Sequence, residues 1–148
     1  MYKSVALVTK ELVRVGADRV RPSGSTLPDS GAGLTPEFLE VATGVRPGTI
    51  RSVEVLDENH GTAGRVRLAL DVPGGELPPT LLAKVTPRNT TQRLMMNLFD
   101  LATREALFYR SIASEVPVRT PRAYAVQLDP GRGRNVILLE DLADTAHF

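Results

Sequence analysis

A single lysine interrupts the apolar run Leu81–Val85, and this interruption constrains the fold more than any other feature of the sequence. The run has the length and composition of a buried strand, in which alternate side chains point to opposite faces of a sheet. Lys84 would then share a face with Leu82, where an unpaired ammonium group is costly to bury. The sequence therefore predicts an acidic partner for Lys84.

The predicted partner is Glu105, which lies in the longest helical pattern of the chain. This pattern begins at a cap formed by residues 89–92 and extends to about residue 113, after which prolines prevent its continuation. Apolar residues repeat in it at the helical period, and Glu105 completes their stripe: Leu94, Leu98, Leu101, Phe108 and Ile112. We expect the lysine of the strand to face the glutamate of the helix.

Each residue of this pair also has an ordinary interpretation. Lys84 could extend into solvent from an edge strand, and Glu105 could pair at the helix surface with Arg104 or Arg110. For either residue alone the surface interpretation is preferred. The two charges together, each interrupting an apolar element, favour the paired arrangement.

Composition limits the classes of function that the chain can have. Its 148 residues suffice for one domain with a core, and 18 basic against 17 acidic residues give a net charge of +1. This charge does not indicate binding to nucleic acid or to an anionic membrane. With no cysteine and two histidines, a metal site is not expected. Without a transmembrane segment or a signal peptide, we expect a cytoplasmic protein.

A proline-, glycine- and serine-rich stretch, residues 21–33, predicts a flexible connector and a domain boundary. Residues 1–33 would then be an N-terminal extension and residues 34–148 the domain. The extension contains a short helical pattern with a possible cap at Ser4 and the apolar residues Val5, Val8, Leu12 and Val15. We interpret this helix as a packing appendage.

The domain itself begins with a second short helix. Thr35 is its predicted N-cap, Pro36 its first residue and Gly44 its end. Strand patterns follow at residues 49–56, 65–72, 81–85, 122–128 and 136–139. The predicted fold class is therefore α+β, with about five antiparallel strands, one long helix packed on the sheet and short helices at the N-terminus.

A glycine-containing loop joins the first two predicted strands. Gly61 and Gly64 at its tip could bring backbone N–H groups close to a phosphate, although two glycines at a hairpin tip are most often turn residues. The chain lacks the G-x-x-x-x-G-K-[S/T] pattern, so a P-loop is excluded.

Three sequence pieces, EALFYR, TPRAY and LLEDL, occur in the same order as in a known family. Over residues 34–142 the chain resembles the N-terminal lobe of aminoglycoside phosphotransferase-like and ecdysteroid/choline kinase-like small-molecule kinases. The resemblance implies that Lys84 contacts the phosphates of ATP and that Glu105 holds Lys84. It further implies a phosphate-covering loop and an adenine-binding hinge, formed respectively by Gly61, Thr62, Ala63 and Gly64 and by the backbone of Glu140, Asp141 and Leu142.

The chain departs from that family in one respect. Such kinases have an H-x-D-x-x-x-x-N stretch and a later aspartate, which supply the catalytic base and the Mg²⁺ ligands, and neither occurs here. We therefore expect the ATP-binding half of a phosphotransferase, inactive alone, with Mg²⁺ and a small-molecule acceptor hydroxyl bound by a missing second lobe. The alternative is a non-catalytic module for nucleotide binding or protein interaction.

A missing second lobe would also leave part of the sheet uncovered. Apolar and backbone groups near Leu139 and Leu142 would then be open, which predicts self-association through this face. Alternatively, residues 143–148 fold back over it, with Phe148 as a plug.

Overall fold

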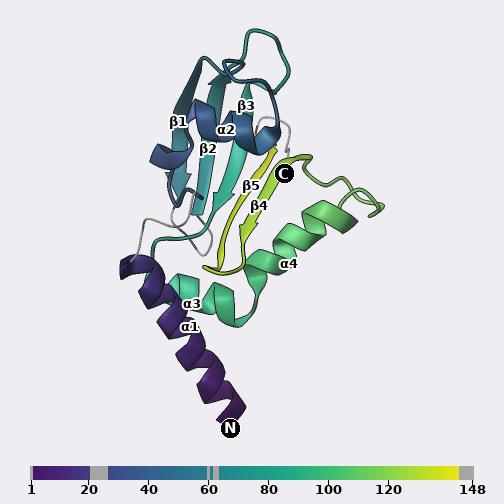
Figure 1. Ribbon diagram of the computed structural model, residues 1–148. Helices are drawn as coiled ribbons and strands as arrows, with labels where there is room; N and C mark the ends of the chain where they lie inside the picture. The colour runs from purple at the N-terminus through teal and green to yellow at the C-terminus, as the bar shows by residue number, and fades with distance from the viewer. Residues whose placement is uncertain (1, 21–26, 60, 62–63, 144–148) are drawn as a thin grey trace.

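The computed structural model describes residues 2–20, 27–59, 61 and 64–143, in which an antiparallel sheet is packed with helices (Figure 1). The strands are β1 (Ser52–Asn59), β2 (Gly64–Asp71), β3 (Thr80–Val85), β4 (Ala123–Asp129) and β5 (Arg134–Glu140). The helices are α1 (Tyr2–Val20), α2 (Pro36–Thr43), α3 (Thr90–Leu98) and α4 (Leu101–Leu107), with a 3-10 turn η2 (Gly31–Gly33) and a π-helical turn η3 (Phe108–Ile112). The predicted α+β class with five antiparallel strands is confirmed.

The strand order is β1-β2-β3-β5-β4, so that β5 lies between β3 and β4. Both of its neighbours pair with it in antiparallel register. Residues 136–139 of β5 are all at most 1% exposed, as expected for a strand covered on both faces. This burial includes Leu139, so the predicted open patch at this residue is wrong: Leu139 is flanked by Leu82 of β3 and Ala123 of β4.

Helix α2 covers one face of the sheet and is fixed by its caps. The Thr35 hydroxyl accepts a hydrogen bond from the Phe38 N–H, and Gly44 ends the helix with a left-handed φ of 75°. Leu39 is completely buried in the core formed with alternate residues of β2, β3 and β5. The three predicted features of this helix, its cap, its first proline and its glycine end, are confirmed.

The predicted long helix is divided in two. Asn89 caps α3 as predicted, accepting hydrogen bonds from the N–H groups of Thr91 and Gln92. Helix α3 ends at Leu98, and Asp100 adopts a left-handed φ of 52° before α4 begins. The residues buried on the two helices are Arg93, Met96, Ala102 and Ala106, whereas Leu101 and Ile112 of the predicted apolar stripe are exposed. The break changes the direction of the second half, and a single helical stripe cannot persist across it.

Helix α1 is longer than the predicted appendage, and it packs beside α3 (Figure 1). Ser4 lies inside this helix instead of capping it. The buried residues of α1 are Glu11, Val15 and Asp18, while Val8 and Leu12 of the predicted apolar face are exposed. The face of α1 that packs on the domain therefore carries two carboxylates beside Val15, and Arg14 donates from it to the backbone carbonyls of Pro130 and Gly131.

The predicted connector is described in its second half only, because residues 21–26 lie outside the described part of the chain. Ser30 and Gly31 are buried, and the Gly31 N–H donates to the Glu58 carboxylate of β1. Residues 27–33 therefore form part of the packed domain. Across the described ranges, none of the helices combines the length and the apolar character needed to cross a membrane.

Candidate functional site

The predicted pairing of Lys84 with Glu105 is confirmed. Lys84 lies on β3, where the alternation of buried and half-buried residues places it on the face opposite Leu81, Ala83 and Val85. Its Nζ donates to Oε1 of Glu105 from α4. Because α2 covers the face that carries Leu81, α4 must lie on the opposite face. The two side chains are 22% and 25% exposed, so the pair remains accessible to a ligand.

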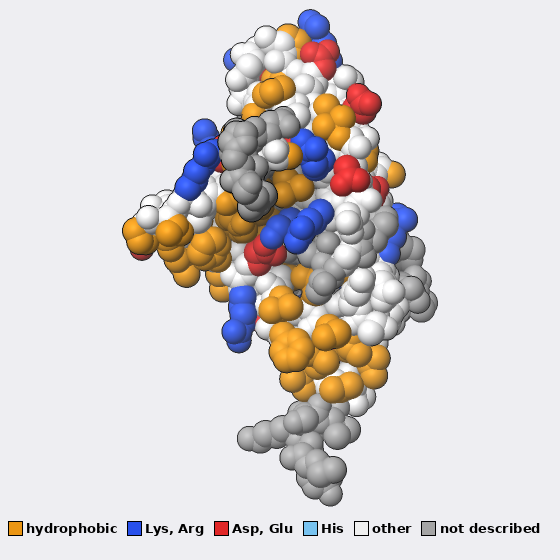
Figure 2. All heavy atoms as spheres, turned by 180° about the vertical axis from the view of Figure 1, so that it is seen from behind, with side chains coloured by type: hydrophobic (Ala, Val, Ile, Leu, Met, Phe, Trp, Pro, Cys, Tyr) orange, Lys and Arg blue, Asp and Glu red, His pale blue; other side chains and the backbone are white. Residues whose placement is uncertain are grey.

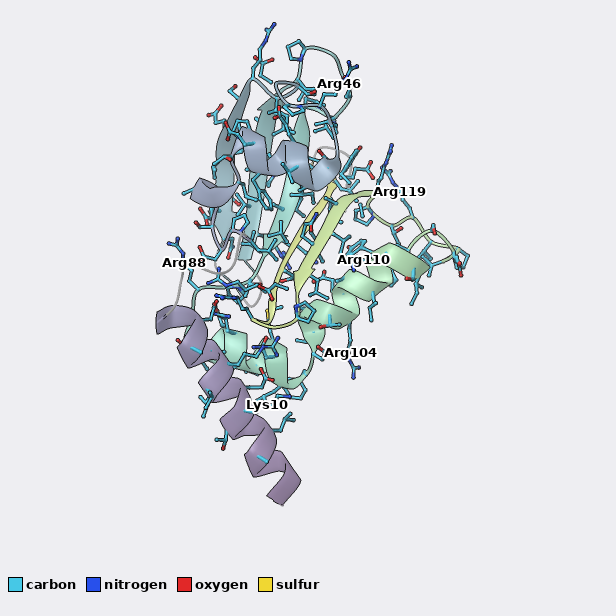
Figure 3. The ribbon with its side chains drawn as sticks, viewed as in Figure 1. Lys10, Arg46, Arg88, Arg104, Arg110 and Arg119 are labelled. Atoms are coloured by element: carbon cyan, nitrogen blue, oxygen red, sulfur yellow. The ribbon has the colours of Figure 1, made fainter. Side chains whose placement is uncertain are left out.

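Neither of the alternative neighbours replaces Lys84 as the partner of Glu105. Arg104 is exposed, and Arg110 donates instead to the backbone carbonyl oxygen of Val126 on β4, at 2.7 Å (Figure 3). Arg110 thereby connects η3, the turn that follows α4, to β4 of the sheet. Glu105 is left facing Lys84.

Two arginines of β2 share the face that carries Lys84. In the register of the sheet, Arg65 lies opposite Lys84 and Arg67 lies opposite Leu82. Figure 2 shows the face turned away from α2, with basic and acidic side chains together near its middle and hydrophobic patches beside and below them. These arginines were not predicted as site residues, although the alternation of β2 places both on the face away from the buried Val66.

Arg67 connects this face to the segment that follows β5. Its Nε and Nη2 each lie 2.9 Å from Oδ2 of Asp141, whose side chain is only 4% exposed. The other oxygen of Asp141, Oδ1, accepts from the backbone N–H of Ala143 at 3.1 Å. The pair joins β2 to the predicted hinge, across 74 positions of sequence. No pattern along the chain indicates such a distant partner.

Glu140, the first residue of the predicted hinge, is bound by residues of the segment that precedes β4. Its Oε1 accepts from Nη2 of Arg119 and its Oε2 from the backbone N–H of Arg122, both at 3.2 Å. The Glu140 N–H donates to the Arg122 carbonyl oxygen at 2.8 Å. Since the side chains of Glu140 and Asp141 are both engaged, they position the backbone that leads to the half-buried Leu142. Whether this backbone receives adenine stays a prediction.

Gly61, the first residue of the predicted phosphate-covering loop, forms a local turn. Its N–H donates to Oδ1 of Asn59 at 2.9 Å, a side-chain-stabilised turn that other residues could also form. Thr62 and Ala63 lie outside the described residues. The covering of a phosphate by this loop stays a prediction.

Gly64, in contrast, is required by packing. A Cβ at this position would lie 2.8 Å from Cγ2 of Val85 and 3.1 Å from its carbonyl oxygen. Gly64 and Val85 are directly opposite each other in the β2–β3 pair. The glycine therefore permits close contact between the two strands, independently of any ligand.

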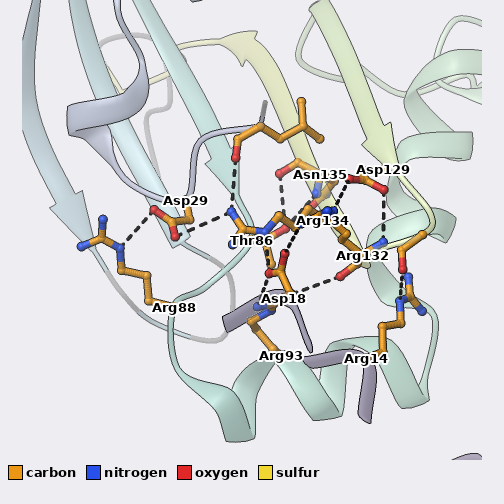
Figure 4. Close-up of polar contacts among 12 residues, drawn as sticks. Arg14, Asp18, Asp29, Thr86, Arg88, Arg93, Asp129, Arg132, Arg134 and Asn135 are labelled. Atoms are coloured by element: carbon orange, nitrogen blue, oxygen red, sulfur yellow. Dashed lines mark hydrogen bonds and ion pairs between the residues drawn. The ribbon is translucent and has the colours of Figure 1, made fainter. Parts of the chain in front are cut away.

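A second charged cluster joins α1 to the sheet (Figure 4). Its centre is Asp18, whose side chain is 1% exposed. Asp18 pairs at 2.8 Å with Arg93 of α3, at 2.8 Å with Arg134 of β5 and at 3.3 Å with Arg132 of the β4–β5 turn. Burial raises the pKa of Asp18, but hydrogen bonds and charge from Arg134 and Arg93 outweigh burial and lower this pKa below its ordinary value.

The charges of the two clusters define what each could bind. Among the described residues, His, Asp and Glu side chains form no group of three or more that could hold a metal ion. Lys84 with Arg65 and Arg67 presents cationic donors beside the carboxylates of Glu105 and Asp141, an arrangement suited to an anion such as a phosphate. Comparisons with family models, curated proteins and solved structures found no match to this chain.

Proposed function

We propose that this chain is the ATP-binding half of a phosphotransferase, and that Lys84 contacts the ATP phosphates. The observation that carries the proposal is the ion pair between Lys84 of β3 and Glu105 of α4. A lysine held by a helix glutamate over an antiparallel sheet is the arrangement by which kinase-like folds orient nucleotide phosphates. The pair is accessible, so an anionic ligand can reach the ammonium group.

The roles of the other residues follow from their places in the fold. Arg65 and Arg67 add positive charge to the face on which the phosphates would lie. The segment from Glu140 to Leu142, fixed by the Arg67–Asp141 and Arg119–Glu140 pairs, would present its backbone to adenine. Mg²⁺ and the acceptor hydroxyl of a small molecule would be bound by a second lobe, which would also supply the base for transfer of the γ-phosphate.

Selective acylation of Lys84 by an ATP acyl phosphate tests the proposal. The ε-amine of a lysine near the phosphates attacks the acyl carbon of this reagent, an amide forms and ATP leaves. The chain has three lysines, Lys3, Lys10 and Lys84, so each can be followed separately by peptide mass spectrometry. We expect preferential labelling of Lys84, suppressed by excess ATP, while the exposed Lys10 reports the background reaction.

The matched control is the same acyl group attached to inorganic phosphate. This reagent lacks the nucleoside, so it should label Lys84 and Lys10 in proportion to their exposure. Equal labelling of Lys84 by both reagents, or labelling by the ATP reagent that excess ATP does not suppress, would refute nucleotide binding at this lysine.

A further inference from the structure

We propose that a second anion site lies between α3, β5 and the segment after β3, and that it binds a phosphate group. A cavity of about 210 Å³ opens there, lined by Asp29, Thr86, Pro87, Arg88, Arg93 and Arg134. This volume is large compared with the roughly 10–15 Å³ that one water molecule requires. Three of the six lining residues that the structure describes are arginines, contributed by the segment after β3, α3 and β5.

The arginines of this cavity are held by the fold before any ligand arrives. Arg134 Nη1 donates to the Leu27 carbonyl oxygen at 3.3 Å, and its Nε pairs with Asp18. Arg93 Nη2 donates to the Arg132 carbonyl oxygen at 3.1 Å. Fixed guanidinium groups lose little conformational entropy on binding, and their planar donors match the oxygens of phosphate.

Arg93 retains an unused donor. The residue is 4% exposed, yet its Nε has no hydrogen-bond partner among the described residues. A buried donor without a partner carries a free-energy penalty, which a ligand oxygen in the cavity would remove. This donor, on a residue that lines the cavity, is the observation that points to a ligand.

The charge of the cavity favours an anion. Its lining contains three guanidinium groups and one carboxylate, that of Asp29, which lies 3.1 Å from Arg88 Nε and 3.7 Å from Arg134 Nη1. Adding Arg132 and the other carboxylates of the network, Asp18 and Asp129, still leaves four arginines against three acids. Over these described side chains the formal charge is therefore positive by one unit.

Phosphate binding at this cavity would be linked to α1. Arg93 and Arg134 both line the cavity and both pair with Asp18 of α1, so a ligand that binds these two arginines also stabilises the arrangement in which the helix is attached (Figure 4). This linkage is reciprocal, because each binding event favours the arrangement that the other requires. The site uses none of the residues assigned to ATP.

Thermal unfolding of the full chain in inorganic phosphate tests the site, with chloride at equal ionic strength as the reference. We expect phosphate to raise the melting temperature because it binds the folded state. Arg88→Met should weaken phosphate binding roughly tenfold, the loss expected for one charge-assisted hydrogen bond. Asp29→Asn should strengthen it, because the only carboxylate among the described lining residues becomes neutral. Phenyl phosphate, tested in parallel, distinguishes a phosphomonoester from free phosphate as the preferred ligand.

Arg119→Met is the matched control. Arg119 and Arg88 are similarly exposed, at 66% and 64%, and each pairs with one carboxylate, but they lie on separate sides of the molecule (Figure 3). The control variant should keep the response to phosphate. A wild-type response no larger than that to chloride would overturn the site, as would changes of the same sign in Arg88→Met and Asp29→Asn.

Discussion

The exposure of Lys84 and Glu105 determines how much their pair can stabilise the fold. Exposed ion pairs contribute about 0–1 kcal/mol, whereas breaking a buried pair costs roughly 3–5 kcal/mol. Since both side chains are about one-quarter exposed, this pair lies between these limits. We therefore expect a contribution between those of exposed and buried ion pairs.

We therefore expect Lys84→Met and Glu105→Gln each to lower the free energy of unfolding by roughly 1–3 kcal/mol, and the double variant to lose less than the sum. Urea unfolding of the four proteins measures the coupling between the two residues. Lys10→Met, on the exposed side of α1, should leave the stability unchanged. Strict additivity of the two substitutions would show that the pair does not form in solution.

The two glycines of the β1–β2 hairpin should respond differently to alanine. Gly64→Ala forces a Cβ against the buried Val85 and should cost about 1–3 kcal/mol, as overpacking does. Among the described residues, the nearest atom to a Cβ at Gly61 is Asn59 Oδ1 at 3.4 Å, so Gly61→Ala should stay within about 0.5 kcal/mol. Guanidinium unfolding compares the two. If the two substitutions lower the free energy of unfolding equally, Gly64 does not pack against Val85 of β3 as closely as described.

Residues that interrupt a pattern could be predicted from the sequence, and residues that join distant segments could not. Lys84 and Glu105 each break an apolar run, so their pairing was predictable. Asp141 was expected only as part of a hinge, because its partner Arg67 lies on another strand. Asp18 had no signal at all, since its three arginines come from α3 and from the β4–β5 turn with the start of β5, both far from α1 in the sequence.

At the scale of elements, the strands were predictable and the helix break was not. Prolines, glycines and alternation mark the strands directly, whereas the helical period continues through Phe99 and Asp100 without a strong breaker. Packing decides between one helix and two, because α3 must lie against α1 while α4 must reach β4 and β5. Propensity alone contains no information on these contacts.

Substitutions at Asp100 test the break. Its left-handed backbone suits glycine and tolerates aspartate, so Asp100→Gly should change the free energy of unfolding by no more than about 0.5 kcal/mol. Asp100→Val should lose about 1–2 kcal/mol, because a β-branched side chain is strained there. Urea titrations of both variants make the comparison. Equal stability of the two would indicate a continuous helix.

At the scale of the whole molecule, α1 is attached to the domain mainly by charge. Asp18→Asn leaves three arginines without their shared carboxylate and should cost roughly 3–5 kcal/mol. Asp57→Asn, which changes an exposed acid of β1, is the control and should be nearly neutral. Urea unfolding at neutral pH compares the variants. If Asp18→Asn lowers the free energy of unfolding by less than about 1 kcal/mol, the value for an exposed ion pair, α1 is not docked as described.

The same residue predicts how stability depends on pH. The folded state lowers the pKa of Asp18, so the unfolded state takes up its proton first as the solution is acidified. The contribution of Asp18 is complete above its unfolded pKa of about 3.9, and it is lost as the pH falls through the lower folded value. Unfolding followed from pH 7 into this acidic range should show a steeper loss for wild type than for Asp18→Asn. If the stability of the two proteins falls in parallel with pH, Asp18 is not a cause of the acid-induced loss of stability.

The position of β5 between β3 and β4 also determines when the sheet can be assembled during synthesis. Strands β1, β2 and β3 form a continuous meander, but its β3 edge gains a partner only after residues 134–140 have been made. Until then the hydrogen-bonding groups of β3 face no strand, and such edges pair readily with other chains. The β4–β5 hairpin completes the sheet by adding β5 to this edge, so a nascent chain that stalls before residues 134–140 should aggregate through β3.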